Sequence, residues 1–255
     1  MREPKINKSR ALYYAMFSRF FIYTSDNSRY FELVNLLNIL KDNPLDNSMK
    51  TAFENILKSI DPTSNINFML EFDEIFHSPE SSTVPTTASF YDENIQSGKK
   101  RVQMQNFLAK TKIRRDEKIY SDYEDHIGFI FSVLSELCSL ISEGEKQYEN
   151  TVHCIFEQIL NEFIDEFSKE LYEHDKADIF KNAIVILKSF IEFERLYLEV
   201  SMPAPRVKIQ EVEIIEDDIS DDEKERRARN RALRATGAKT ESCSIHIAYE
   251  VEDDI

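Results

Sequence analysis

The chain has 255 residues, 42% of them hydrophobic and 31% charged, so it can bury a substantial core, either as one large domain or as a domain with a tail. Its four glycines disfavour β-sandwiches, barrels and glycine-rich nucleotide loops, because these use glycine where the backbone turns sharply or approaches a phosphate. The net charge of −15 repels polyanions, so we expect no nucleic-acid partner.

Apolar residues recur at spacings of three and four along the first part of the chain, as they do on one face of an α-helix. The spacing predicts four helices with these stripes: Leu12, Met16, Phe20 and Tyr23; Phe31, Val34, Leu37 and Leu40; Met49, Phe53, Ile56, Leu57 and Ile60; Phe68, Met69, Phe72 and Phe76. Between the third and fourth, we expect Asp61 to cap free amides and Pro62 to open the next helix.

A loop through Pro79 and Pro85 to Ser89 is predicted next, and then a short helix around residues 99–110. Three long apolar stripes follow: Ile127, Ile130, Phe131, Leu134, Leu137, Cys138 and Ile141; Ile155, Phe156, Ile159, Leu160, Phe163, Phe167 and Leu171; Ile179, Phe180, Ala183, Ile184, Leu187, Phe190 and Ile191. We expect Gly144 to end the first, and Pro203 and Pro205 to end the last. Wide stripes with short connections predict an all-α protein, a single helical bundle over residues 1–205.

The composition changes after Arg206, where an acidic block, a basic block and an acidic end follow one another. Such blocks with few aromatic residues cannot bury enough surface to offset the entropy of ordering. We therefore expect residues 206–255 to form a charged, disordered tail in which 223–234 could be a transient helix.

Compartment and chemistry are predicted mainly from what the sequence lacks. Cys138, Cys154 and Cys243 are widely spaced, which favours reduced thiols in a cytoplasmic protein. No run approaches the roughly 18 apolar residues of a membrane span, and Arg19 interrupts the apolar start, so we expect an amphipathic first helix and no stable membrane insertion. No histidines or cysteines have i, i+4 or C-x-x-C spacing and no nucleophile elbow is present, so we expect no metal, no cofactor and no enzyme. A helical enzyme with acidic residues in its core is the alternative.

Asp125 and His126, which open an apolar helix, allow two interpretations. In the structural one, Asp122 caps the helix, Asp125 favours its positive end and His126 is an ordinary first-turn residue. That interpretation leaves open why histidine, a poor choice beside the positive end of a helix, stands there. The Pro79–Pro85 loop is similarly either a crossover or one wall of an apolar groove.

Together these residues resemble the TorD/DmsD family of cytoplasmic redox-enzyme maturation chaperones over about residues 8–200. The matching residues are Phe72, Phe76 and Pro79; Pro85, Ser89 and Tyr91; Asp122, Asp125 and His126. Glu124 stands where the family often has proline, and Asp122 where it often has glutamate, so the turn before the helix departs from the family pattern.

The resemblance implies a chaperone that binds the twin-arginine signal peptide or the apo form of a molybdenum-cofactor oxidoreductase through these nine residues and assists its maturation before export. In this reading, Asp125 holds a guanidinium, His126 makes binding pH-sensitive, and the negative surface attracts the arginine pair. Overall similarity favours formate dehydrogenase as the client over the nitrate, trimethylamine-oxide or dimethyl-sulfoxide reductases. A homodimer is compatible with the family. The alternative is a generic helical interaction or regulatory protein that acts through its charged tail.

Overall fold

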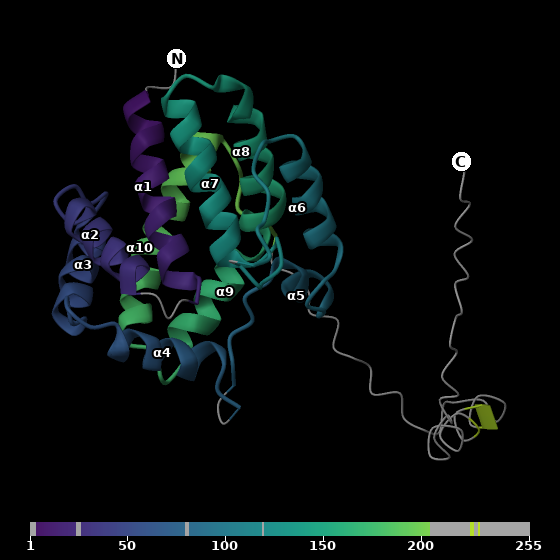
Figure 1. The fold of residues 1–255 in the computed structure, drawn as a ribbon, viewed down its shortest axis with the longest axis horizontal. Coiled ribbons are helices and arrows are strands. Elements are labelled where there is room, and N and C mark those ends of the chain that lie inside the picture. Colours follow the sequence, from purple (N-terminus) through teal and green to yellow (C-terminus); the bar gives the residue numbers. More distant parts are fainter. Residues whose placement is uncertain are drawn as a thin grey trace, which may run out of the picture. The chain divides into compact units, whose positions relative to one another are not determined.

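The computed structural model describes residues 4–23, 27–79, 82–118 and 120–204, with residues 225, 226 and 229 (Figure 1). No β-strand occurs among these residues, which confirms the predicted all-α fold. The helices are α1 (Pro4–Phe21), α2 (Asn27–Leu40), α3 (Asn47–Ser59), α4 (Ile66–Phe76), α5 (Ala88–Glu93), α6 (Lys99–Ala109), α7 (Ile127–Ser142), the 3-10 turn η1 (Lys146–Tyr148), α8 (Glu149–Ile155), the π-helical turn η2 (Phe156–Leu160), α9 (Asn161–Glu173) and α10 (Ile179–Leu198).

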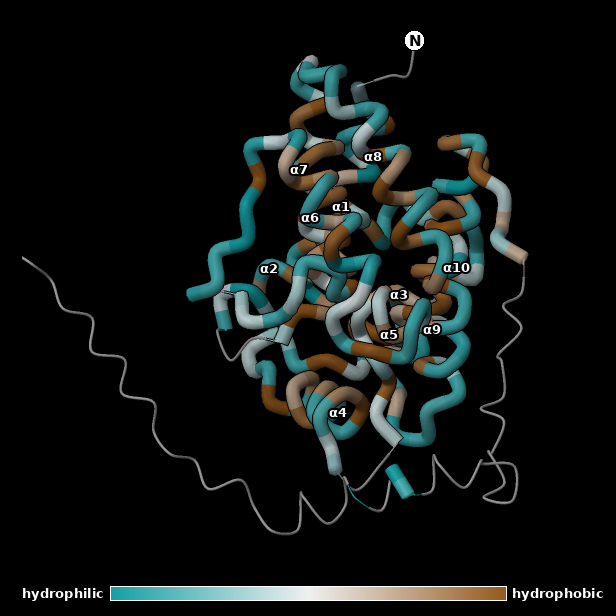
Figure 2. Tube along the Cα trace, turned by 90° about the vertical axis from the view of Figure 1, so that its right-hand side faces the viewer, coloured by the Kyte–Doolittle hydropathy of each residue, from teal (hydrophilic) through white to brown (hydrophobic). Residues whose placement is uncertain are grey.

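Helices α1 and α7 lie side by side and form the most extensive pairing of the bundle (Figure 1). The ring of Phe131 on α7 lies 5.4 Å from that of Phe17 and 6.0 Å from that of Phe21 on α1. Gly128 permits this approach, because a Cβ there would lie 2.9 Å from the Phe21 carbonyl oxygen and 2.6 Å from Ile22. Hydrophobic residues recur along these helices, whereas the peripheral connections are mostly hydrophilic (Figure 2).

The first turn of α10 is capped by a carboxylate from another helix. Glu71 of α4 accepts hydrogen bonds from the backbone amides of Asp178 at 2.8 Å, Ile179 at 3.1 Å and Phe180 at 2.9 Å. These amides have no partner within α10, and the positive end of the helix favours a negative charge. Glu71 therefore joins α4 to the start of α10.

A buried ion pair joins α1 to α10 near the opposite end of α10. The guanidinium of Arg10 donates to both carboxylate oxygens of Glu194, at 2.6 and 2.7 Å, and the Tyr14 hydroxyl donates to the same carboxylate at 2.6 Å. Asn7 accepts a further bond from Arg10 at 2.8 Å. Every charge in this buried cluster is thus met by an opposite charge or a hydrogen bond, as burial requires.

The apolar stripes predict the helices well, but two predicted helix boundaries are wrong. Pro62 does not open α4, which begins at Ile66; Asp61 instead accepts from the Thr63 amide in a tight turn. Helix α10 ends before Pro203, because Glu199 adopts a left-handed conformation with φ of 58°.

Several expectations concern single residues or segments. Tyr23 and Phe31, expected on apolar stripes, are 46% and 45% exposed. Cys138 is a free, fully buried thiol, and burial raises its pKa to about 12. Among the described residues no helix is long and apolar enough to cross a membrane. Cys243 and the predicted tail, apart from residues 225, 226 and 229, lie outside the described residues.

Candidate functional site

A cleft of about 480 Å³ opens where α4 ends and α7 begins. Its lining comes from the end of α4, the loop into α5, α5 itself, the turn between α5 and α6, and residues 121–126. The lining residues are Phe76, Thr83, Val84, Pro85, Thr86, Thr87, Phe90, Gln96, Ser121, Asp122, Tyr123 and His126. The loop before α5 is therefore a wall of the cleft, as one of the two interpretations held. The lining mixes apolar and polar side chains and is less apolar than we expected.

Backbone hydrogen bonds hold the loop against its neighbours. The Val84 amide donates to the Ile75 carbonyl at 3.0 Å, the Ala88 amide to the Asp125 carbonyl at 3.0 Å, and the Ile127 amide to the Thr86 carbonyl at 2.8 Å. The first bond fixes the loop to α4, and the others fix it to the start of α7. The cleft wall thus has a defined position without belonging to a helix.

Asp125 fastens the loop from beneath. Its side chain is fully buried, and one carboxylate oxygen accepts from the Ser89 amide at 2.9 Å and the Ser89 hydroxyl at 2.5 Å. Burial raises the pKa of this carboxyl, while the bonds from Ser89 oppose the rise. Asp125 is fully buried and does not line the cleft, so it is not accessible to an external guanidinium. Asp122, whose side chain is 46% exposed, is the carboxylate that lies at the cleft.

His126, not Asp122, is the N-cap of α7. Its Nδ1 accepts from the Gly128 amide at 3.2 Å, and the Tyr120 hydroxyl lies 2.6 Å from the same nitrogen. Because an amide can only donate, Nδ1 is unprotonated and the neutral ring carries its proton on Nε2, which lies 4.0 Å from a carboxylate oxygen of Asp122. Burial lowers the pKa of His126 to about 4. A neutral histidine that accepts a hydrogen bond suits the positive end of a helix, which answers the question its position raised.

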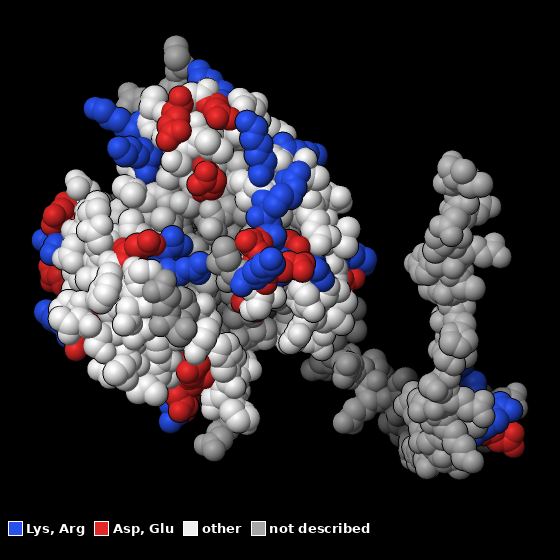
Figure 3. Space-filling model, in the orientation of Figure 1, with Lys and Arg blue, Asp and Glu red and all other residues white. Residues whose placement is uncertain are grey.

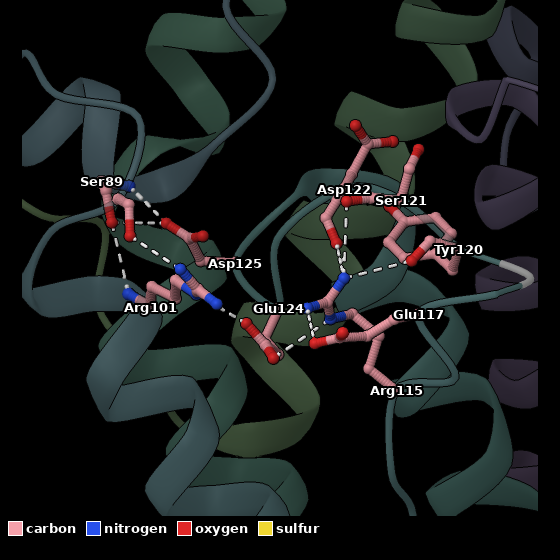
Figure 4. Close-up of polar contacts among 10 residues, drawn as sticks. Ser89, Arg101, Arg115, Glu117, Tyr120, Ser121, Asp122, Glu124 and Asp125 are labelled. Carbon is pink, nitrogen blue, oxygen red and sulfur yellow. Dashed lines mark hydrogen bonds and ion pairs between the residues drawn. The ribbon is translucent and has the colours of Figure 1, made fainter. Parts of the chain in front are cut away.

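Glu124 organises the segment before α7 (Figure 4). Its carboxylate accepts from Arg101 Nε at 2.8 Å and from Arg115 Nε at 3.1 Å. Burial by itself would raise the pKa of Glu124, but these and other hydrogen bonds prevail and lower it to about 2. Arg115 also donates to the carbonyls of Tyr120 at 3.1 Å and Asp122 at 3.0 Å, and so fixes the backbone that carries the cleft residues.

The apolar patterns did not predict this arrangement, and Glu124 was noted only as a departure from a family motif. The one local signal was the adjacent pair Arg114 and Arg115, because guanidinium groups donate several hydrogen bonds to carbonyls and carboxylates. The residue opposite Arg115, Arg101, comes from α6 and has no sequence proximity to Glu124.

The nine predicted site residues fall into three groups. Phe76, Pro85, Asp122 and His126 line the cleft, whereas Ser89 and Asp125 fasten its wall from within. The other three do not line the cleft, although Tyr91 contacts the backbone of its wall. Phe72 is a core residue, 2% exposed, whose ring lies 4.6 Å from that of Phe76; Pro79 is exposed; and Tyr91 stacks on Phe163 at 5.4 Å with its hydroxyl 3.0 Å from the Pro85 carbonyl.

The cleft lining carries negative charge, whereas the surface around it carries charges of both signs (Figure 3). Acidic and basic side chains are interspersed on the face of the molecule in Figure 3. The cleft lining, by contrast, includes Asp122 and no lysine or arginine. A neighbouring hollow of about 430 Å³, which shares Thr83, Val84 and Pro85 with the cleft, contains Glu170 and Glu173 and again no lysine or arginine. This part of the surface favours a cationic ligand.

The described residues contain no group of three histidine, cysteine, aspartate or glutamate side chains placed to hold a metal ion. Arg115 holds the backbone that carries the cleft residues, and His126 is occupied as a cap. The arrangement supports recognition of a ligand by surface contacts.

Comparisons with known proteins complete the description of the site. The family model described as the nitrate reductase delta subunit matches residues 42–169, which include all nine predicted site residues. No curated protein matches the chain. The fold is similar to the crystal structure of a candidate redox enzyme maturation protein from Archaeoglobus fulgidus, with 18% sequence identity, coverage of 72% of this chain and 93% of the other, and a TM-score of 0.45.

Proposed function

Because the chain belongs to the nitrate reductase delta subunit family, whose TorD-like members are redox-enzyme maturation chaperones, we propose that its cleft binds the twin-arginine signal peptide of an apo molybdenum-cofactor oxidoreductase. Binding would take place in the cytoplasm, before export of the client, and requires no bond chemistry from this chain. We propose that the chain also binds the apo form of the oxidoreductase to which the signal peptide belongs.

The observation that carries the proposal is the composition of the cleft. The half-buried Phe90, with the edges of the buried Phe76 and Val84, would contact the hydrophobic stretch of a signal peptide. Asp122 offers a half-exposed carboxylate to one guanidinium. The second guanidinium would lie toward Glu170 and Glu173 in the neighbouring hollow. In this proposal apolar and polar contacts of the cleft lining both contribute to the affinity, and the carboxylates supply the preference for arginine.

Isothermal titration calorimetry with twin-arginine leaders encoded beside this gene tests the proposal. We expect Asp122→Asn to weaken binding about 1.4- to fivefold, because an ion pair at a half-exposed site contributes about 0.2–1 kcal/mol. Asp42→Asn makes the same change at an exposed site outside the cleft lining and serves as the control. A leader with both arginines replaced by glutamine should also bind more weakly to the wild-type protein.

The proposal fails if no leader binds and no apo-oxidoreductase co-purifies with the chain. It also fails if Asp122→Asn and Asp42→Asn bind every leader as the wild type does. The same titration, run with leaders of formate dehydrogenase and of nitrate, trimethylamine-oxide and dimethyl-sulfoxide reductases, tests the proposed preference for formate dehydrogenase. Equal affinity for another leader would remove the proposed preference, and higher affinity for another leader would assign the client to that enzyme instead.

A further inference from the structure

A separate hollow of about 280 Å³ lies between α1, α7 and the segment that follows α6. Its polar lining comes from three parts of the chain: Ser18 and Arg19 on α1, Arg114 on the segment after α6, and Ser132, Ser135 and Glu136 on α7. None of its lining residues lines the cleft. The role proposed for the cleft therefore leaves this hollow unexplained.

Ser18 is the residue that indicates a ligand. Its side chain is fully buried, it lines the hollow, and its hydroxyl has no hydrogen-bond partner among the described residues. A buried hydroxyl without a partner has lost its hydrogen bonds to water, and most such groups in folded proteins are satisfied. The unsatisfied hydroxyl at the wall of an open hollow is thus suited to a partner that enters from solvent.

Arg114 is held so that one edge of its guanidinium remains available. Its Nη1 donates to the carbonyls of Leu108 at 2.7 Å, Thr111 at 2.8 Å and Ile113 at 2.6 Å, which fixes the side chain against the end of α6. No described residue accepts from its Nε or Nη2. A guanidinium presents its donors in a rigid fork, so the second edge is suited to two oxygens of one anion.

We propose that this hollow binds a phosphate group. The Ser18 hydroxyl, the Ser132 hydroxyl and the fixed guanidinium of Arg114 come from three different elements, as suits donors to a tetrahedral oxyanion. Glu32 offsets the charge of Arg19 at 2.7 Å, and the exposed Glu136 is the one acidic residue in the lining. Arg114 therefore supplies the positive charge of the lining that no described carboxylate pairs with.

The proposal is tested by measuring the binding of inorganic phosphate to the full-length chain. Calorimetry gives the affinity, and the shift in thermal unfolding midpoint gives the stabilisation. Sodium chloride at equal ionic strength is the reference. We expect Arg114→Gln to weaken phosphate binding two- to fivefold, because a charge-assisted hydrogen bond from an exposed side chain is lost. Lys112→Gln removes the same charge from the same segment, at an exposed residue outside the hollow, and should bind as the wild type does. Glu136→Gln should tighten binding two- to fivefold, since a like charge is removed.

Ser18→Ala separates a ligand site from a packing feature. Without phosphate the variant should unfold at a temperature no lower than the wild type, because the lost hydroxyl had no partner, whereas with phosphate its stabilisation should be several-fold smaller than that of the wild type. The proposal is overturned if phosphate stabilises the wild type no more than chloride does. It is equally overturned if Arg114→Gln binds phosphate as tightly as Lys112→Gln. Neither outcome depends on the titrations with leader peptides.

Discussion

Replacement of His126 by asparagine should remove a large part of the stability change that the protein undergoes between pH 7 and pH 5. His126 caps α7 as a neutral ring, 5% exposed, with Nδ1 accepting from the Gly128 amide at 3.2 Å. An asparagine side chain also accepts from that amide and is a good N-cap, but it does not titrate. The substitution therefore keeps the cap and removes the proton equilibrium.

The size of the effect follows from the pKa of His126, which is about 4 in the folded protein and about 6.5 in an unfolded chain. The pKa is lowered on folding, so the unfolded state binds more protons between these values. The contribution of His126 is fully present above about pH 6.5 and is lost as the pH falls toward 4. Linkage between the two pKa values gives a loss of about 2 kcal/mol between pH 7 and pH 5.

Urea unfolding followed by circular dichroism at pH 7, 6 and 5 measures this loss. The asparagine variant also lacks the contact between the Tyr120 hydroxyl and the ring, which lowers its stability by a similar amount at every pH, so the difference in slope is the quantity to compare. We expect the wild type to lose about 2 kcal/mol more than the variant over this range. If the two proteins lose stability in parallel, His126 is not held neutral in the folded state and the cap geometry is wrong.

Three further substitutions test the framework around the site. Gly128→Ala should lower the free energy of unfolding by about 1–3 kcal/mol, because its Cβ would overlap the backbone of α1; a thermal midpoint equal to that of the wild type would contradict this. Glu71→Gln should destabilise by about 1–2 kcal/mol and speed hydrogen exchange in the first turn of α10, with the exposed Glu54→Gln as the control; unchanged exchange would rule out the cap. Glu194→Ala should lower the free energy of unfolding, measured in guanidinium chloride, by about 3–5 kcal/mol, because the buried side chain of Arg10 loses its ion pair. A smaller loss than that of Glu194→Gln would refute the ion pair.

The helices could be predicted from the sequence because each stripe repeats with the period of the element it belongs to. Helix ends were less predictable, since they depend on partners elsewhere. The first turn of α10 is capped by Glu71, which lies more than 100 residues earlier in the sequence. The helix ends where Glu199 adopts φ of 58°. The predicted helix through residues 155–171 contains the π-helical turn η2, which no apolar pattern distinguishes from a regular helix.

The cleft was predicted in part for the same reason. Phe76, Pro85 and His126 were found from local features, namely an aromatic helix end, a proline loop and a helix start. The sequence did not predict that Asp122 and Asp125 differ in exposure. Asp125 becomes buried and accepts hydrogen bonds from Ser89 only after folding, whereas Asp122 stays half exposed. Glu124 was missed since its two arginine partners become neighbours only after folding.

The carboxylate that caps α10 belongs to the same helix, α4, that supplies Phe76 to the cleft. An outward movement of this wall would draw Glu71 away from three backbone amides at once, so the cap opposes widening of the cleft. The width of the cleft therefore depends on a helix cap outside its lining, and a substitution of Glu71 is expected to change that width without altering any lining residue.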